Sequence, residues 1–362
     1  MTVRTDTDVA VVGGGIVGAA VAFCAAAAGP GRRITVLDRG DADTATQWSL
    51  GVMAPWAGSL GQRVLLERGA VRLRDHALRD VIRPCLRRIP VLVAGSAGTL
   101  DGLARSTVGT RMEPAPAALS AAARSAYGEP LLRPGDEVAT VRGGFTVMDT
   151  QAAAEALLGA VADRAGGRVH TGADVTRVER TRGGTQRLSL ACGEVLTTRG
   201  TVLATGPWPG PELDTGRVER RPWRTKRIAA LRIDRDLPPQ APVVCFPDDD
   251  LFVLPAPVGA GSPGGAWASF RSEEWDVPPG DGGPHEPGTG TVAAGRAVVA
   301  GRLPELADSA RAGRVAVDGY TADRTPLTDQ PAPGVVRALA ASGGGARFCW
   351  GMADQVLELL AP

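Results

Sequence analysis

Three glycines near the start of the chain are spaced as in a dinucleotide-binding turn. Gly13, Gly15 and Gly18 form the pattern G-x-G-x-x-G between an apolar run at residues 9–12 and a helix-forming stretch at residues 19–28. In such a turn the first glycine permits the tight bend, the second lets the backbone approach a pyrophosphate, and the third lets the helix pack on the sheet. The phosphates would lie at the helix N-terminus, where free N–H groups favour negative charge.

The acidic residue that such a unit requires follows at the right distance. A second apolar run at residues 34–37 ends at Asp38, about 20 residues after Gly18, where a carboxylate could accept a hydrogen bond from a ribose hydroxyl. Strand, glycine turn, helix, strand and acid together predict a β-α-β unit that binds a dinucleotide. The alternative is a glycine-rich turn in an ordinary α/β domain. The position at the N-terminus slightly favours FAD, and an NAD(P) enzyme stays open.

Composition excludes several classes of protein. The chain has 362 residues and a net charge of +1, which predicts one large domain or two moderate ones and indicates neither nucleic acid nor an acidic membrane as a partner. The five cysteines are far apart and the three histidines form no ligand cluster, so we expect no disulfide framework and no metal site. Glycines interrupt the apolar N-terminal stretch, which argues against a membrane segment. We expect a cytoplasmic protein.

Helical periodicity is clearest in two stretches. Apolar residues at helical spacing predict one or two amphipathic helices over residues 63–92, separated or kinked at Pro84. A further helix is expected over residues 152–165, with Thr150 as its cap. These helices would accompany the nucleotide-binding unit.

A second sheet is expected in the later half of the chain. Four apolar runs follow one another without helices between them, at residues 227–233, 243–246, 251–254 and 266–270. They predict a mostly antiparallel sheet, distinct from the nucleotide-binding domain. Residues 94–137 have no clear period, so their structure stays open, and residues 278–290, rich in Gly and Pro, are expected to form a mobile loop.

Four segments together resemble the D-amino-acid oxidase superfamily, the FAD-dependent amine oxidases that include glycine oxidase and monomeric sarcosine oxidase. They are DVAVVGGGIVGAAVA with VLDRG, then ATQWSLGVMAPWA, then GGFTVMDTQAAAEALLGAVADRAGGRVHTGADVTRVE with GTVLATGPWPG, and finally VDGYTADRTPLTD with LAASGGGARFCWGMADQVLEL. The resemblance implies a discontinuous α/β Rossmann-like FAD-binding domain with an inserted α+β substrate domain on a mostly antiparallel sheet. The FAD-binding domain would comprise residues 1–90, 140–215 and 312–362, and the substrate domain residues 91–139 and 216–311.

The resemblance also implies which residues hold a noncovalently bound FAD. The pyrophosphate and ribose binders would be Gly13, Gly14, Gly15, Ile16, Val17, Gly18, Asp38 and Arg39. The loop that lines the flavin would contribute Thr46, Gln47, Gly51, Val52 and Met53, and the adenine contact would be Val175. The turn beneath the cofactor would contain Ala204, Thr205, Gly206 and Trp208, and the pyrimidine edge of the flavin would meet Gly343, Gly344, Gly345, Ala346, Arg347 and Phe348.

The implied reaction is hydride transfer from the carbon beside a neutral amine to flavin N5, which gives an imine that water can hydrolyse. The flavin carries the difficult step, and the protein supplies orientation and electrostatics. The substrate would be a small amine or amino acid. The residues expected to act on it are Arg347, Tyr320, Met53 and Trp267.

Arg347 follows the glycine loop where sarcosine oxidase-like sequences carry a substrate-binding lysine. A guanidinium offers a planar two-point grip on a carboxylate. The alternatives are that Arg347 pairs with a nearby acid or contacts the flavin, and Arg324 and Arg271 are the reserve candidates for the carboxylate.

The chain departs from its relatives at two places. Asp318 and Gly319 stand where sarcosine oxidase-like sequences carry the cysteine that bonds to the flavin, so no covalent link is expected there. Trp267 stands near the place of their oxygen-activating lysine, whereas Lys226, the only lysine of the chain, is elsewhere. An oxidase that uses O2 is the leading interpretation. A dehydrogenase with another acceptor or partner subunit, and a flavin-binding partner protein without turnover, are the alternatives, and the oligomeric state stays open.

Overall fold

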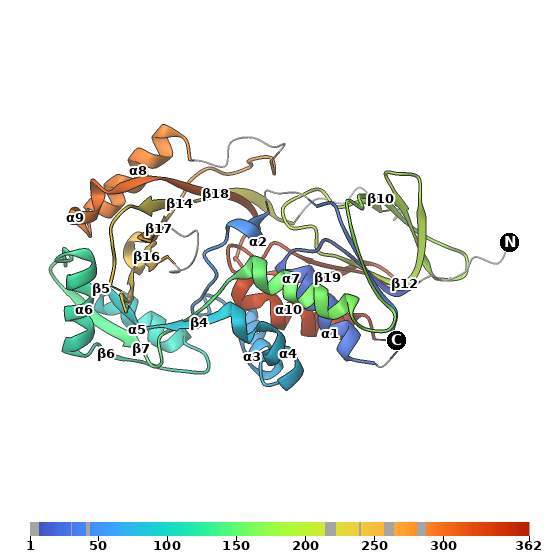
Figure 1. Cartoon of the computed structure of the whole chain (residues 1–362), viewed down its shortest axis with the longest axis horizontal. Helices are drawn as coiled ribbons and strands as arrows, with labels where there is room; N and C mark the ends of the chain where they lie inside the picture. The colour runs from blue at the N-terminus through green and yellow to red at the C-terminus, as the bar shows by residue number, and fades with distance from the viewer. Residues whose placement is uncertain are drawn as a thin grey trace.

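The computed structural model divides the chain into two regions that lie side by side along its long axis (Figure 1). One region contains a nine-stranded sheet and the other an eight-stranded sheet, with a small three-stranded sheet besides. The residues that the structure describes are 7–29, 31–40, 44–213, 222–238, 240–256, 264–280 and 287–361.

The predicted β-α-β unit is present. β1 (Thr7–Val12) and β2 (Ile34–Asp38) pair in parallel, and α1 (Ile16–Ala27) connects them. All residues of α1 from 18 to 26 are buried, and most are alanine. Such small side chains let the helix lie close to its neighbours on several sides, so α1 packs against both the sheet and two other helices.

The sheet continues on both sides of this unit. Its strand order is β13-β10-β11-β12-β1-β2-β9, with β20 beside β12 and β19 beside β20. The added strands are β9 (Gly167–Thr171), β10 (Val175–Arg180), β11 (Gln186–Leu190), β12 (Val195–Leu203), β13 (Glu212–Leu213), β19 (Leu327–Ala332) and β20 (Val335–Leu339).

Helices cover one face of the nine-stranded sheet. α1 lies between α7 (Thr150–Ala162) and α10 (Gly345–Leu359), and α10 also packs against α3 (Leu60–Arg72), which precedes α4 (His76–Ile82). Their apolar side chains form one core with those of β1, β2 and β20. The sheet therefore presents the ends of its parallel strands, and the N-termini of α1 and α10, toward the second region.

The second region confirms the predicted antiparallel sheet. Its strand order is β18-β14-β17-β16-β15-β5-β7-β6, and only the β15–β5 pair is parallel. The strands are β5 (Val91–Ser96), β6 (Met112–Pro114), β7 (Asp136–Val141), β14 (Arg224–Ile233), β15 (Val243–Phe246), β16 (Leu251–Pro255), β17 (Ala266–Phe270) and β18 (Ala310–Tyr320).

Four helices accompany the eight-stranded sheet at one end of the molecule in Figure 1: α5 (Ala97–Ser106), α6 (Ala117–Tyr127), α8 (Thr289–Ala300) and α9 (Pro304–Ala307). The short helix α2 (Ala45–Trp48) lies between the two regions, near the small sheet of β3 (Val52–Met53), β4 (Leu86–Ile89) and β8 (Phe145–Met148). Among the helices of the described ranges, none is long and apolar enough to cross a membrane.

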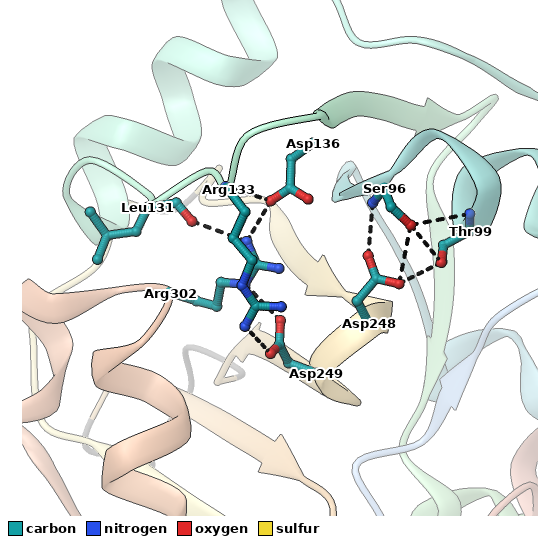
Figure 2. Close-up of polar contacts among 8 residues, drawn as sticks. All are labelled: Ser96, Thr99, Leu131, Arg133, Asp136, Asp248, Asp249 and Arg302. Carbon is teal, nitrogen blue, oxygen red and sulfur yellow. Dashed lines mark hydrogen bonds and ion pairs between the residues drawn. The ribbon is translucent and has the colours of Figure 1, made fainter.

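A polar cluster fixes one turn of the eight-stranded sheet (Figure 2). Arg302, which is 1% exposed, donates from Nη1 to the Asp136 carboxylate at 2.5 Å and from Nε to the Asp249 carboxylate at 2.6 Å. Asp249 belongs to the turn η2 (Pro247–Asp249), and its neighbour Asp248 accepts from the Ser96 N–H at 2.7 Å. The cluster thus ties the β15–β16 connection to β5 and β7.

The structure corrects the prediction for residues 63–92. α3 and α4 are helices as predicted, but they are separated before Asp75, whose carboxylate accepts from the first amides of α4. Pro84 lies instead in the turn η1 (Arg83–Cys85). Residues beyond it form β4 and the start of β5 because they pair with β8 and β7, a long-range effect that outweighs local periodicity.

The expected cap of α7 is also wrong. Asp149 is the cap, and its carboxylate accepts from the Ala152 N–H at 3.0 Å. Thr150 is the first residue of the helix, and its hydroxyl donates to the Thr46 carbonyl at 2.5 Å. Thr150 therefore ties α7 to α2 rather than closing its own helix.

The division into two domains at the expected residues stays a prediction. The boundary at residue 312 falls inside β18, which pairs with β14 along its length. The stretch 94–137, left open above, holds α5, β6 and α6. Of the expected mobile loop over 278–290, residues 281–286 lie outside the described residues.

Candidate active site

A cavity of about 450 Å³ lies where the two regions meet. Its lining includes the glycine turn before α1, α2 and the loop after it, the loop before α10, and residues of the eight-stranded sheet, above all of β14 and β18. Large, mostly apolar cavities of this kind with a few convergent polar groups are the usual places for a cofactor and a small substrate.

The glycine turn leaves backbone exposed at one end of the cavity. Gly13 has a φ of 105°, and a Cβ there would overlap the carbonyl oxygen of Ala204. Gly15 precedes α1 without a side-chain cap, and it lines the cavity with Ile16 and Val17. The first-turn amides of a helix lack intrahelical acceptors, so this turn fits a diphosphate.

Two side chains bond to amides of this turn. The Ile16 N–H donates to Thr46 Oγ1 at 2.9 Å, and the Gly14 N–H donates to the Asp38 carboxylate. Asp38, Arg39, Val175 and Trp208, expected on the ribose and adenine side, do not line the cavity. Arg39 lies over the Trp208 ring, with its Cζ atom 5.3 Å from the ring centre, and the buried Val175 belongs to an apolar core. The glycine turn thus fits a diphosphate, and both the phosphate contacts and the adenine contacts stay predictions.

The structure brings half of the predicted cofactor residues to the cavity. Those that line it are Gly15, Ile16, Val17, Thr46, Gly51, Val52, Ala204, Gly206, Gly343, Gly345, Ala346 and Arg347. Those that do not are Gly13, Gly14, Gly18, Asp38, Arg39, Gln47, Met53, Val175, Thr205, Trp208, Gly344 and Phe348. Several of the residues that do not line the cavity belong to the same turns as residues that do.

In the loop after α2, neighbouring residues differ in whether they line the cavity. Gly51 has a φ of 64°, and a Cβ there would overlap the Met148 carbonyl oxygen. The next two residues form β3, where successive side chains point to opposite sides. Val52 lines the cavity, whereas Met53 packs against the core that contains α1. Met53 therefore does not lie where the predicted contact with substrate would require it.

The loop before α10 is anchored to β18. The Gly343 N–H donates to the Asp318 carboxylate at 2.7 Å, and Gly343 has a φ of 75°. A Cβ on Gly343 would lie 2.7 Å from the Tyr320 hydroxyl, so glycine permits a close approach of the loop to that ring. Asp318 also accepts from the Gly319 N–H at 2.8 Å, and burial raises its pKa to about 6.

Arg347 projects into the cavity from the first turn of α10. Its Nη1 donates to the Trp56 carbonyl at 3.0 Å, and its Cζ atom lies 4.3 Å from the centre of the Phe348 ring. Burial lowers the pKa of Arg347 to about 10, so the guanidinium is charged at neutral pH. No carboxylate within the described part of the chain pairs with it, which leaves donors free for an anionic ligand.

Tyr320 and the buried Lys226 lie side by side in the lining. The Lys226 Nζ atom is 5.6 Å from the centre of the Tyr320 ring and 4.9 Å from that of Trp275. Lys226 is only 6% exposed, and burial lowers its pKa. Sequence reasoning missed this residue. All residues of β14 from 226 to 230 line the cavity, so strand alternation gave no signal for Lys226 in particular.

Trp267, expected in the site, lies behind a residue that lines the cavity. It does not line the cavity, but the Cζ atom of Arg314, which does, lies 4.2 Å from its ring centre and 5.7 Å from that of Trp48. Burial lowers the pKa of Arg314. The reserve candidates Arg271 and Arg324 also line the cavity, but both are exposed and Arg271 pairs with Glu273 at 2.5 Å.

Comparison with known proteins identifies the family. A family model described as FAD dependent oxidoreductase matches residues 8–359. The chain therefore belongs to the family of FAD dependent oxidoreductases, which confirms the expected enzyme class and cofactor. The noncovalent binding expected above is typical of the family. A comparison with curated proteins found no match.

Solved structures share the fold over nearly the whole chain. Amadoriase I from Aspergillus fumigatus, a fructosyl amine:oxygen oxidoreductase, has 18% identity and a TM-score of 0.74, with 99% of this chain and 87% of that chain covered. L-proline dehydrogenase from P. horikoshii has 15% identity and a TM-score of 0.77, with 99% and 94% covered. Glycine oxidase from Geobacillus kaustophilus has 17% identity and a TM-score of 0.69, with 98% and 94% covered. At these identities the likeness shows the fold, including the inserted substrate domain.

Proposed function

We propose that this enzyme oxidises a C–N bond of a small amino acid or amine to the imine, with O2 as the electron acceptor. The observation that carries the proposal is the guanidinium of Arg347, which reaches the cavity without an acid partner in the described residues. The similar structures named above support the substrate class, since their names refer to fructosyl amines, proline and glycine. FAD, when bound, supplies the hydride acceptor at flavin N5.

Arg347 would hold the carboxylate of an amino acid. Its one hydrogen bond, to the Trp56 carbonyl, orients the side chain and leaves other donors for the ligand. A charge-assisted pair with a carboxylate is strong in a cavity of low polarity, and a planar guanidinium can make two such bonds at once. The grip would fix which carbon of the substrate faces the flavin.

Tyr320 would complete this grip. Burial raises the pKa of its hydroxyl, which is therefore protonated at neutral pH and can donate a hydrogen bond. Its ring meets that of Trp275 edge to face, with the centres 5.6 Å apart. That contact fixes the hydroxyl near Gly343, beside the loop that leads to Arg347.

The test is bleaching of the bound flavin without oxygen. The purified enzyme is mixed anaerobically with a panel of small amines and amino acids, and the flavin absorbance is followed. Bleaching by at least one of them, followed by hydrogen peroxide formation when air is admitted, is the expected result. Bleaching without peroxide would favour the dehydrogenase alternative over O2. No bleaching by any amine, in a protein that retains FAD, would overturn the proposal.

A further inference from the structure

Lys226 is a buried cation whose side chain has no hydrogen-bonded partner among the described residues. Its side chain lines the cavity from β14, and its contacts within the described residues are the ring faces of Trp275 and Tyr320. An ammonium group removed from water is costly unless it is paired and hydrogen-bonded. The two rings recover a part of that cost, and an anionic ligand in the cavity would recover more.

The acids around Lys226 are engaged elsewhere or held apart. Asp318 is its neighbour across the β14–β18 pair, yet no ion pair joins them, and the Asp318 carboxylate accepts from the Gly319 and Gly343 amides. Glu273 pairs with Arg271. Asp250 acts on Lys226 through charge alone, with no bond between them. The donors of Lys226 are therefore available to a ligand.

Lys226 and Arg347 both line the cavity together with Tyr320. Lys226 lies against the Tyr320 ring. The Tyr320 hydroxyl lies next to Gly343, the loop residue that leads into α10 and Arg347. Lys226 and Arg347 therefore line one cavity close to the same aromatic residue, and within the described residues neither is paired with an acid.

We propose that Lys226 binds a second acidic group of the substrate, so that the cavity selects dicarboxylic amino acids or amines of similar charge. The proposal rests on the proposed function, in which Arg347 holds the first carboxylate. The substrate would span the two cations, with its C–N bond held between them. Neutral amino acids of the same length would leave Lys226 unpaired and would bind less well.

The test is calorimetric binding to the FAD-loaded enzyme and requires no turnover. Two pairs of ligands are compared, succinate with butyrate and glutarate with valerate, because each pair differs in a carboxylate against a methyl group. In the wild type, the dicarboxylate of at least one pair should bind at least about 10-fold more tightly, the effect of a charge-assisted bond. Lys226→Met should abolish that preference, and Lys226→Arg should restore part of it.

Arg232→Met is the matched control. Arg232 lies on the same strand, β14, but does not line the cavity, and its guanidinium pairs with Asp234 at 2.7 Å. Its removal deletes the same charge outside the cavity and should leave the preference within about two-fold, since a partly exposed pair contributes little. Equal affinity of the wild type for the members of both pairs, or a preference that survives in Lys226→Met, would overturn the proposal.

The binding result is independent of the proposed reaction. A preference for dicarboxylates that depends on Lys226, in an enzyme whose flavin no amine bleaches, would support the Lys226 site and contradict the proposed function. Bleaching by neutral amino acids, without any preference for dicarboxylates in binding, would support the proposed function and overturn the Lys226 site.

Discussion

The cluster around Arg302 and the cavity around Arg347 hold buried cations in opposite ways. Burial alone would lower the pKa of Arg302, but the hydrogen bonds that it donates to Asp136 and Asp249 outweigh burial and raise that pKa (Figure 2). Among the described residues, the hydrogen-bonding partner of Arg347 is a carbonyl, and burial lowers its pKa to about 10. The charge of Arg302 is thus paired with two carboxylates inside the fold, whereas that of Arg347 has no carboxylate partner in the described residues.

The carboxyl groups of the two places show the same difference. Asp136 is buried, but hydrogen bonds from the Arg133 amide and the Arg302 guanidinium bring its pKa below the ordinary value. Asp318 is buried and lies opposite Lys226 in the strand pair, yet burial raises its pKa to about 6. Charges that are matched stabilise the fold, and charges that are left unmatched in a cavity are available for binding.

The largest effect is expected from removing Arg302, the cation that is paired with two carboxylates. Arg302→Met leaves the Asp136 and Asp249 carboxylates without their main cation in a buried place. Removal of one partner from a buried ion pair costs about 3–5 kcal/mol of unfolding free energy. Urea unfolding of the FAD-loaded enzyme measures the loss. Arg271→Met, which breaks the exposed pair with Glu273, should cost less than about 1 kcal/mol, and equal losses for the two variants would contradict the contrast.

Arg347→Met should damage catalysis rather than stability. Loss of the charge-assisted grip on a carboxylate should lower kcat/KM for amino acids by about 100-fold, which corresponds to roughly 3 kcal/mol. Amines without a carboxylate should lose much less, as steady-state kinetics with both substrate types would show. Equal losses for both types would place Arg347 against the flavin instead.

The parts of the site that sequence reasoning found are those fixed by short-range pattern. Gly13, Gly15 and Gly18 could be predicted because the turn between a strand and a helix demands glycine at that spacing. Arg347 was expected from the resemblance, because it follows the glycine loop where sarcosine oxidase-like sequences carry a lysine, and that loop opens α10. In both cases the signal lies within a short segment of sequence.

Residues placed by long-range packing could not be found in that way. Lys226 and Arg314 reach the cavity because β14 pairs with β18 and one face of that pair turns toward α2. Alternation shows which side chains share a face, but not which face meets the other region. Met53 shows the same limit, because the sequence does not reveal that its side chain packs against the core that contains α1 and not toward the cavity.

The pH dependence of the unfolding free energy tests whether the buried carboxyl group of Asp318 lacks a cationic partner. Its pKa of about 6 in the folded chain exceeds the ordinary value of 3.8, so the folded state binds more protons between these values. The contribution of Asp318 to stability is therefore greatest below about pH 4 and declines as the pH rises to about 6, by about 3 kcal/mol in total. Asp318→Asn should remove this decline, as urea unfolding at several pH values would show. If the unfolding free energy of the variant depended on pH in the same way as that of the wild type, the carboxyl group of Asp318 would be paired within the fold.

The smallest effect is expected from deleting the unmatched lysine. Lys226→Met removes an ammonium group whose burial is costly and replaces it with an apolar chain of similar length. It also removes the contacts with the Trp275 and Tyr320 rings, which are worth about 0.5–2 kcal/mol. The two terms oppose each other, so the unfolding free energy without ligand should stay unchanged or rise by about 1 kcal/mol. Added succinate should then stabilise the wild type more than the variant, because a ligand stabilises the state that it binds. A loss of more than about 2 kcal/mol in the ligand-free variant would show that Lys226, like Arg302, is already satisfied within the fold.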